Sequence, residues 1–345
     1  MMGTSTDDIR KRQRDRGRWA NTPIAIPWRG WRDILYRVFV GFGQNRILLT
    51  AAGVSFFMLF AMVPSLSLFV TGYGLLNNPA SVIDQLNLLE GVVPDGGLDI
   101  IRDQLVRLTS QNTGSLGLAL LVSLVVAFWG ASAGIKALFE AMNVVYGEIE
   151  KRNFIQINLR ALLFVIGAVA MLVIMLLVVL VMPPLLQFLA LGEVEWLIRA
   201  GAYGVMLVAL LAGLSAVYRW GPSRADAKWR WITPGLIFSA LGILAMSAGY
   251  SYYAANFSNY DATYGSLGAL IGFLTWVWLS VTIIILGGSL NSEIEHQTAV
   301  DSTTGAPRPL GERGAFVADS VGGKTPAMGG AALENHVEID EANRG

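Results

Sequence analysis

The chain has 345 residues, of which 54% are hydrophobic and only 14% are charged. In a typical soluble domain about 25% of the residues are charged, so this composition indicates an integral membrane protein. Its 25 basic and 25 acidic residues balance overall but are unevenly distributed along the chain. The absence of cysteine excludes disulfides, thiolate nucleophiles and cysteine-ligated metal or iron–sulfur sites, and we expect no metal and no cofactor.

The first 27 residues are predicted to be a basic, disordered N-terminus. Residues 10–18, RKRQRDRGR, consist mainly of Arg and Lys. Such a run fits either a nucleic-acid patch or a cytoplasmic flank that fixes orientation and contacts anionic lipid headgroups. We favour the flank and expect no nucleic-acid partner. No short apolar run with a small-residue cleavage site follows, so a cleaved signal peptide is not expected.

Residues 28–296 are predicted to form the membrane domain, and it opens with an amphipathic helix at Trp28 to Phe42. In that helix Trp31, Ile34, Leu35, Val38, Phe39 and Phe42 recur at helical spacing, opposite Arg32, Asp33 and Arg37. The pattern predicts a helix that lies in the membrane surface and leads into the first span.

Six apolar stretches follow, each long enough to cross the hydrocarbon core of a bilayer, which is about 30 Å thick. The last of them has no charged residue, and at a rise of about 1.5 Å per residue it spans the core with some tilt. The predicted fold class is therefore all-α: a polytopic membrane protein with six transmembrane helices. The expected spans are residues 47–70, 115–135, 161–182, 200–218, 232–255 and 267–290.

Proline and small residues mark special positions along these spans. Pro64 is predicted to kink the first span. Gly130 and Gly134 form a small-xxx-small pair that lets another helix approach closely. Gly235, Gly242 and Gly249 recur every seven residues, which favours a helix-packing seam over a substrate path. Trp276 and Trp278 lie mid-span, so at least one is expected to pack against neighbouring helices.

The charges of the connections predict the topology. The loop from Asn77 to Gly114 is acidic and is expected to form a helical outer loop, with two short amphipathic helices. The loops after the second and fourth spans are basic, so we place both termini in the cytoplasm and the protein in the cytoplasmic membrane. Residues 297–345 are rich in Gly, Ala, Pro, Ser and Thr and are predicted to be a disordered tail.

Four dispersed segments stand out along the chain: GASAGIKALFEAMNVVYGEIEKR, YRWGPSRADAKWRWITPG, YSYYAANFSNYDATYGSLGAL and GGSLNSEIE. They resemble the YihY/BrkB family of bacterial inner-membrane proteins, and the similarity covers about Ile34 to Glu295. The resemblance implies a six-helix membrane protein. The family was once labelled ribonuclease BN, is elsewhere called a virulence or serum-resistance factor, and includes members linked to lipid or lipopolysaccharide-precursor traffic.

A polar collar is predicted where the second and sixth spans leave the membrane on the cytoplasmic side. Two interpretations stay open: a functional collar that holds an anionic headgroup or gates a cavity, and a static hydrogen-bonded lock between helix ends. Lys136 and Glu140 can pair, at a spacing of four. The predicted collar residues are Lys136, Glu140, Asn143, Arg219, Arg224, Asn291 and Glu293.

The residue inventory decides between classes of function. RNA hydrolysis needs a His or carboxylate pair or metal ligands, whereas Glu140, Glu293 and Glu295 stand singly at membrane ends, so we expect no enzyme and no catalytic residues. Ion-coupled transport lacks its usual charged groups at mid-bilayer. The leading hypothesis is handling or translocation of a lipid-like amphiphile in envelope biogenesis, with membrane lipids as partners. The alternative is a non-transporting scaffold for envelope proteins, and a homo-oligomer stays open.

Overall fold

A computed structural model describes residues 13–76, 113–189, 195–257 and 268–322, and within these ranges all the regular elements are helices, as predicted. The one β contact there is an isolated bridge between Ala227 and Thr303. The helices are η1 (Pro23–Ala25), α2 (Trp28–Gln44), α3 (Ile47–Leu76), α6 (Thr113–Tyr146), α7 (Phe154–Leu189), α8 (Glu195–Trp220), α9 (Trp229–Phe257), α11 (Gly268–Glu295) and α12 (Phe316–Asp319).

The long helices fit the predicted membrane spans. Five of them are long and apolar enough to cross a bilayer, and α2 with α3 supplies a sixth when this pair, bent by 60°, is counted as one span. Each helix exceeds its predicted stretch; α6, for example, runs on to Tyr146, because polar residues such as Lys136 do not interrupt a helix. The chain is a multi-pass all-α membrane protein.

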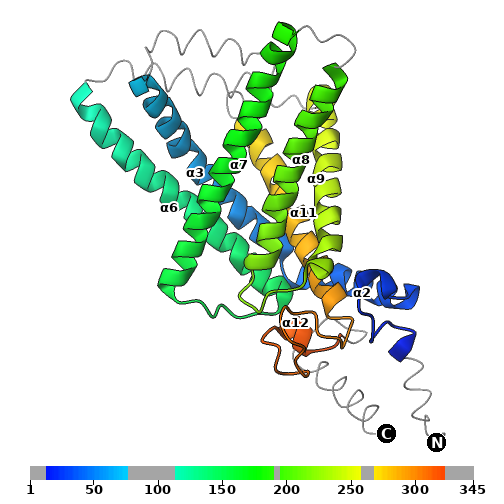
Figure 1. Ribbon diagram of the computed structural model, residues 1–345. Coiled ribbons are helices and arrows are strands. Elements are labelled where there is room, and N and C mark those ends of the chain that lie inside the picture. The colour runs from blue at the N-terminus through cyan, green and yellow to red at the C-terminus, as the bar shows by residue number, and fades with distance from the viewer. Residues whose placement is uncertain (1–12, 77–112, 190–194, 258–267, 323–345) are drawn as a thin grey trace, which may run out of the picture.

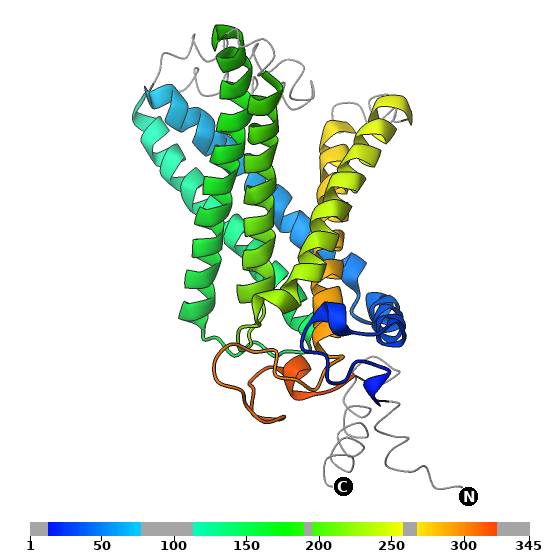
Figure 2. The ribbon, with the colours of Figure 1, turned by 45° about the vertical axis from the view of Figure 1, so that its right-hand side comes forward.

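The helices converge at one end of the bundle, which we call the base: the end where α6 and α11 finish and α7 and α9 begin. From the base the α3–α6 pair and the α9–α11 pair diverge, with α7 packed on α6 and α8 between α7 and α9 (Figures 1 and 2). α11 packs against α9, α3, α6 and α2, so the last span is the central contact of the bundle.

Apolar side chains bury most completely between α3, α6, α8, α9 and α11. This core includes Ile47, Val54, Met142, Ile232 and Ile285. By contrast, large apolar side chains on α7 and α8 are exposed, as expected for helices that face lipid. Among the latter are Leu163, Ile166, Val169, Leu207 and Val208.

Glycines let α9 approach α11 closely near the base. A Cβ atom at Gly235 would lie 2.1 Å from the carbonyl oxygen of Gly287, and one at Gly242 would lie 2.9 Å from Ile283 Cγ2. At Gly249 a Cβ would meet no described heavy atom within 4 Å, so the prediction that this third glycine packs against a helix is wrong. The two helices diverge before Gly249 is reached.

Small residues on α6 serve the contact with α3. A Cβ at Gly130 would lie 3.3 Å from the Cα of Ala61, and one at Gly134 would lie 3.5 Å from Phe57 Cβ. α3 is therefore the helix that comes close to this pair of glycines.

The two mid-span tryptophans of α11 contact neighbouring helices. Trp276 donates a hydrogen bond to Ser247 Oγ of α9 at 3.0 Å, and Trp278 donates one to the carbonyl oxygen of Leu48 in α3, also at 3.0 Å. The expectation that at least one of them packs inside the bundle is confirmed.

α2 forms as predicted but presents its faces differently. Arg37, expected on the polar face, is fully buried against α11, whereas Phe39 is 79% exposed. The helix packs on α11 through Ile34 and Arg37, because a largely buried carboxylate, Glu293, is available to the arginine.

Both predicted disordered ends are folded where the structure describes them, so the expectation of disorder is wrong for residues 13–27 and 297–322. We call these two ranges the terminal segments. They lie at the base, next to one another (Figure 1), and Arg18 of the first segment is buried against Gln297 and Gly322 of the second. The predicted outer-loop helices lie outside the described residues, and so does the side chain of Pro64, whose predicted kink stays a prediction.

Candidate functional site at the base of the bundle

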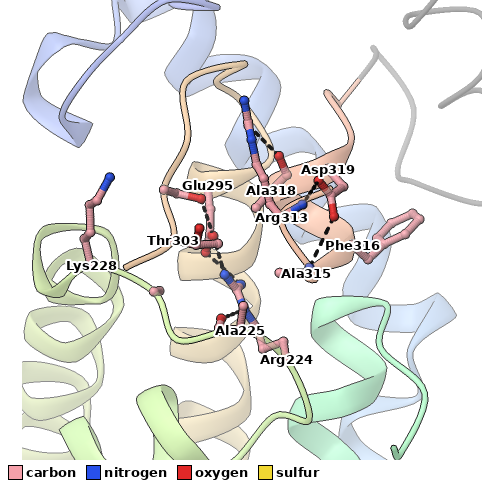
Figure 3. Close-up of polar contacts among 12 residues, drawn as sticks. Arg224, Ala225, Lys228, Glu295, Thr303, Arg313, Ala315, Phe316, Ala318 and Asp319 are labelled. Carbon is pink, nitrogen blue, oxygen red and sulfur yellow. Dashed lines mark hydrogen bonds and ion pairs between the residues drawn. The ribbon is translucent and has the colours of Figure 1, made fainter. Parts of the chain in front are cut away.

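An ion pair between Arg224 and Glu295 lies at the centre of the base. Arg224 comes from the loop between α8 and α9, and Glu295 is the last residue of α11. Arg224 Nη1 lies 2.8 Å from Glu295 Oε2, Nη2 contacts Oε1, and the exposed fractions of the two side chains are only 2% and 1%. Figure 3 shows the arginine reaching from its loop to the end of α11.

The surroundings satisfy both charges. Ser302 Oγ donates a hydrogen bond of 2.5 Å to the Glu295 carboxylate, and the Arg224 guanidinium lies 5.1 Å from the centre of the Tyr146 ring. Burial alone would lower the pKa of Arg224, but Glu295 outweighs burial and raises it. The guanidinium therefore stays charged, and the pair connects the α8–α9 loop to α11.

Asn291 joins α11 to α9 one turn above this pair. Its Oδ1 accepts a 2.7 Å hydrogen bond from the backbone N–H of Gly235. Asn291 Nδ2 and Tyr146 Oη are both buried and neither makes a hydrogen bond of normal geometry, but the Asn291 side chain lies close enough to interact with the Tyr146 hydroxyl. The two side chains are therefore neighbours inside the base.

A second ion pair joins α2 to α11. Arg37 Nε lies 2.5 Å from Glu293 Oε2, and its Nη2 donates to the Glu293 carbonyl oxygen at 3.1 Å and to Gln297 Oε1 at 2.7 Å. His296 Nδ1 lies 3.7 Å from the same Glu293 oxygen. Burial lowers the pKa of His296, although Glu293 acts in the opposite direction.

A third group joins the α6–α7 loop to the α8–α9 loop. Asn143, buried at the end of α6, donates to Glu150 Oε2 at 3.0 Å and accepts from the Ser223 N–H at 2.7 Å. Arg152 Nη2 lies 2.6 Å from Glu150 Oε2 and 2.9 Å from the Gly221 carbonyl oxygen. Burial would raise the pKa of Glu150, but hydrogen bonds from Arg152 and Asn143 lower it to about 2.

Arg219 is separate from these groups. It donates to the carbonyl oxygen of Ala227 at 2.6 Å, lies 3.9 Å from Asp226 and sits 4.6 Å from the centre of the Trp229 ring. It stabilises its own loop.

Lys136 and Glu140 lie outside the base contacts. Lys136 Nζ donates to Asn158 Oδ1 of α7 at 3.0 Å, and the expected pair with Glu140 is not formed. The Glu140 side chain is exposed and makes no polar contact to the described residues.

The second terminal segment is bonded to three parts of the base. Lys228 N–H donates to the Ser302 carbonyl oxygen, Thr304 N–H to that of Asp226, and Ala225 N–H to that of Gly314. The segment has its own supports, some of them visible in Figure 3: Arg313 donates to the Ala318 carbonyl oxygen, and the Asp319 carboxylate accepts backbone N–H groups from four residues. Phe316 N–H donates to Glu148 Oε1, and Gly322 N–H to the His296 carbonyl oxygen.

The predicted collar therefore divides into separate contacts. No hydrogen bond or ion pair among the described residues joins Lys136 or Glu140 to Asn291 or Glu293, so the expectation that the two groups meet is wrong. Asn143, Arg224, Asn291 and Glu293 belong to buried contacts that close the base. The described residues contain no group of three His, Asp or Glu side chains placed to hold a metal ion.

Several residues of the base were not among the predicted site residues. Glu295 was considered only as a boundary anchor, and Arg18 and Arg37 only as solvent- or lipid-facing charges. One sequence feature could have indicated these contacts. Three ionisable residues, Glu293, Glu295 and His296, follow the uncharged part of the last span, and each needs a partner if it is buried.

The chain is similar to a Bacillus subtilis protein, YfkH, that is named as ribonuclease-like: 27% identity over 270 residues, covering 76% of this chain and 93% of YfkH. It is 24% identical over 293 residues to a UPF0761 membrane protein of Nitrosospira multiformis, covering 80% of this chain and 64% of that protein. A UPF0761 membrane protein of Methylibium petroleiphilum is 25% identical over 277 residues, which cover 74% of this chain and 61% of that protein. The chain thus spans less than two thirds of the length of the two UPF0761 proteins.

No solved structure matches the chain. The model of the family described as virulence factor BrkB matches residues 38–310, which include all the described helices from α3 to α11. The match also contains Glu293, Glu295, Arg224 and most of the second terminal segment. The chain belongs to the virulence factor BrkB family of membrane proteins.

Proposed function

We propose that this membrane protein handles or translocates a lipid-like amphiphile in envelope biogenesis, and that it has no catalytic activity. The observation that carries the proposal is the divergence of the α3–α6 and α9–α11 pairs above a base closed by polar contacts (Figure 2). Helices that part in this way turn apolar side chains toward the acyl chains of the surrounding lipid, while polar contacts close the base.

The chemistry of the diverging helices favours an amphiphile over a bare ion. Residues 47–76, 113–135, 231–257 and 268–292, which make up most of these helices, contain no Asp, Glu, Lys or Arg, and the charges of α6 begin at Lys136. Charged groups at mid-bilayer are the usual sign of ion coupling, since they bind the ion or relay protons. Uncharged apolar walls suit a molecule that brings its own hydrocarbon.

The test is transbilayer movement of lipid in liposomes. Protein is reconstituted at a fixed protein-to-lipid ratio with a headgroup-labelled phospholipid, and the label in the outer leaflet is reduced chemically. The expected result is that more than the outer-leaflet half of the label becomes accessible, at a rate that rises with protein density. Liposomes with an unrelated multi-pass protein at equal density are the control, and equal rates in both would contradict translocation.

A scaffold for envelope proteins is the second candidate. The observation that favours it is the pair of folded terminal segments, which extend the protein beyond the bundle at the base. A scaffold predicts a stable complex with an envelope protein and no lipid movement in the liposome experiment.

Ribonuclease activity, which the name of YfkH suggests for that protein, is not supported for this chain. The His296–Glu293 pair is the nearest approach to an acid–base pair among the described residues, and the exposed fraction of His296 is 1%. A polynucleotide has no access to it, so we expect purified protein to leave RNA intact.

We also propose that the base faces the cytoplasm, with both termini on that side. The chain has no cysteine, so single cysteines can be placed at will. Glu312→Cys, exposed in the second terminal segment, should resist an impermeant maleimide in intact cells and react after permeabilisation. Trp196→Cys, exposed at the opposite end of the bundle, should react in intact cells. The reverse pattern would invert the topology.

A further inference from the structure

The outward face of α6 changes character along its length. Val122, Val125 and Trp129 are 55%, 67% and 60% exposed, and Lys136 and Glu140 follow toward the base. Spacings of three, four, seven and four residues place these side chains on one face of the helix, so they form a continuous line. We call it the α6 stripe.

Lys136 differs from the three arginines that form the close ion pairs near the base. Arg37, Arg152 and Arg224 each contact a carboxylate, whereas Lys136 Nζ has one neutral partner, Asn158 Oδ1, and no carboxylate of the described residues within 4.0 Å. An ammonium group carries three donors, so two remain for another acceptor. A half-buried cation in a membrane helix ordinarily has a partner.

Glu140 is one helical turn closer to the base. Side chains four residues apart are about 6 Å apart at Cβ and can pair, but Lys136 and Glu140 do not. The stripe therefore presents a cation and then an anion, side by side, each with unused hydrogen-bonding capacity.

The depth of these charges fits the headgroup layer. Lys136 precedes the end of α6 at Tyr146 by ten residues, which is about 15 Å of helix. The polar layer on each side of a bilayer is several ångströms thick beyond a hydrocarbon core of about 30 Å. Because α6 is inclined in the bundle (Figure 1), this length of helix covers less than about 15 Å of depth, and we infer that Lys136 lies at the boundary between headgroups and acyl chains.

We propose that the α6 stripe, with Asn158, binds a phospholipid whose headgroup carries both a phosphate and a primary amine. The order along the stripe toward the base is apolar, positive, negative; the order in such a lipid toward the water is acyl chains, phosphate, ammonium. The phosphate receives hydrogen bonds from Lys136, and the ammonium donates to Glu140. This inference deepens the proposed function, on which it rests, by naming the lipid class and the residues that select it.

The two proposed contacts, phosphate with Lys136 and ammonium with Glu140, predict an order of binding affinities among three phospholipids. Phosphatidylglycerol offers the phosphate but no cation, so Glu140 disfavours it. Phosphatidylcholine offers a cation without N–H donors, so it forms no hydrogen bond to Glu140. Phosphatidylethanolamine satisfies both charges, and charge-assisted hydrogen bonds are the stronger kind.

The experiment measures lipid binding to the purified protein in detergent, by native mass spectrometry over a titration of each of the three lipids. Lys136→Met should weaken phosphatidylethanolamine binding about tenfold, and Lys136→Arg should restore most of it. Glu140→Gln should remove the preference for phosphatidylethanolamine over phosphatidylglycerol. Lys151→Met is the matched control, because Lys151 lies on the base and pairs with Glu148, and it should bind as wild type does.

Two outcomes would overturn the inference. One is an unchanged dissociation constant for phosphatidylethanolamine in Lys136→Met. The other is equally tight binding of glycerophosphoethanolamine, which has the headgroup but no acyl chains and would identify a site for soluble phosphate esters. Lipid-free melting temperatures of the variants verify that each is folded. Because the assay scores binding, it stands apart from translocation: selective binding without lipid movement in liposomes would leave this site intact and refute transport.

Discussion

Arg224 and Glu295 are 71 residues apart in the chain and form a bidentate ion pair that is almost completely buried. The pair holds the α8–α9 loop against the end of α11, and Ser302 of the second terminal segment donates to the same carboxylate. One glutamate thus binds three parts of the base together.

Breaking this pair from one side is expected to destabilise the protein strongly. Glu295→Gln leaves the Arg224 guanidinium buried without a counter-charge, which costs about 3–5 kcal/mol. The double variant Arg224→Met, Glu295→Met removes both charges and should recover part of the loss. Melting temperatures in detergent measure this, with Glu140→Gln as the exposed control. A single variant as stable as wild type would show that the pair contributes nothing.

Two buried tyrosines should respond unequally to the same substitution. Tyr218 Oη lies 2.6 Å from Ser239 Oγ and donates to the Ile284 carbonyl oxygen at 2.9 Å, so Tyr218→Phe should cost about 1–3 kcal/mol. Tyr146 Oη has the Asn291 side chain beside it but no hydrogen bond of normal geometry, so Tyr146→Phe should cost less than Tyr218→Phe. Equal losses in both variants would contradict this difference.

Substituting alanine for each of two glycines of α9 should distinguish a close helix contact from a position with free space around it. Gly235→Ala would place a methyl group 2.1 Å from a backbone oxygen of α11, so the yield of folded protein should fall sharply. Gly249→Ala meets nothing within 4 Å, and it should be neutral or slightly stabilising because alanine favours helix more than glycine does. Fluorescence-detected size-exclusion chromatography compares the two, and a normal profile for Gly235→Ala would contradict the contact.

Stability should depend on pH through His296. Burial lowers the pKa of His296 in the folded protein, and Arg37 and Arg18 act in the same direction. The unfolded chain therefore takes up a proton near pH 6.5 that the folded chain refuses, so the stability that His296 contributes above this pH is lost as the pH falls below it. The fall in melting temperature from pH 7.5 to 5.5 should be smaller in His296→Gln. An identical fall would place the effect elsewhere.

The sequence predicts the membrane helices well because one physical property decides them. An apolar run in lipid must satisfy its backbone within itself, so residues 267–290 can form little except a helix. Gly235 and Gly242 were also readable, since small residues at a seven-residue period mark close packing. Gly249 was not, because the sequence period continues where the two helices diverge.

The contacts of the base could not be predicted from the sequence equally well, because they join residues that lie far apart in the chain. Arg37 and Glu293 are 256 residues apart, and no local pattern shows that one will bury the other. The composition of the second terminal segment led to the wrong prediction of disorder, because Gly, Pro and Ser are typical of disordered chains. In the structure, Asp301 and Asp319 accept backbone N–H groups and fix the turns of this segment. A segment of this kind folds because it has a surface to fold on.

The joining of the two terminal segments at the base has a consequence for biosynthesis. Arg18 donates to the carbonyl oxygen of Gln297, 279 residues later in the chain, so this hydrogen bond cannot form until the last span has been made. At about 5–20 residues per second, translation takes about 15–60 s to cover that distance. The contact between the two terminal segments is therefore assembled last, and a chain truncated before Gln297 lacks it.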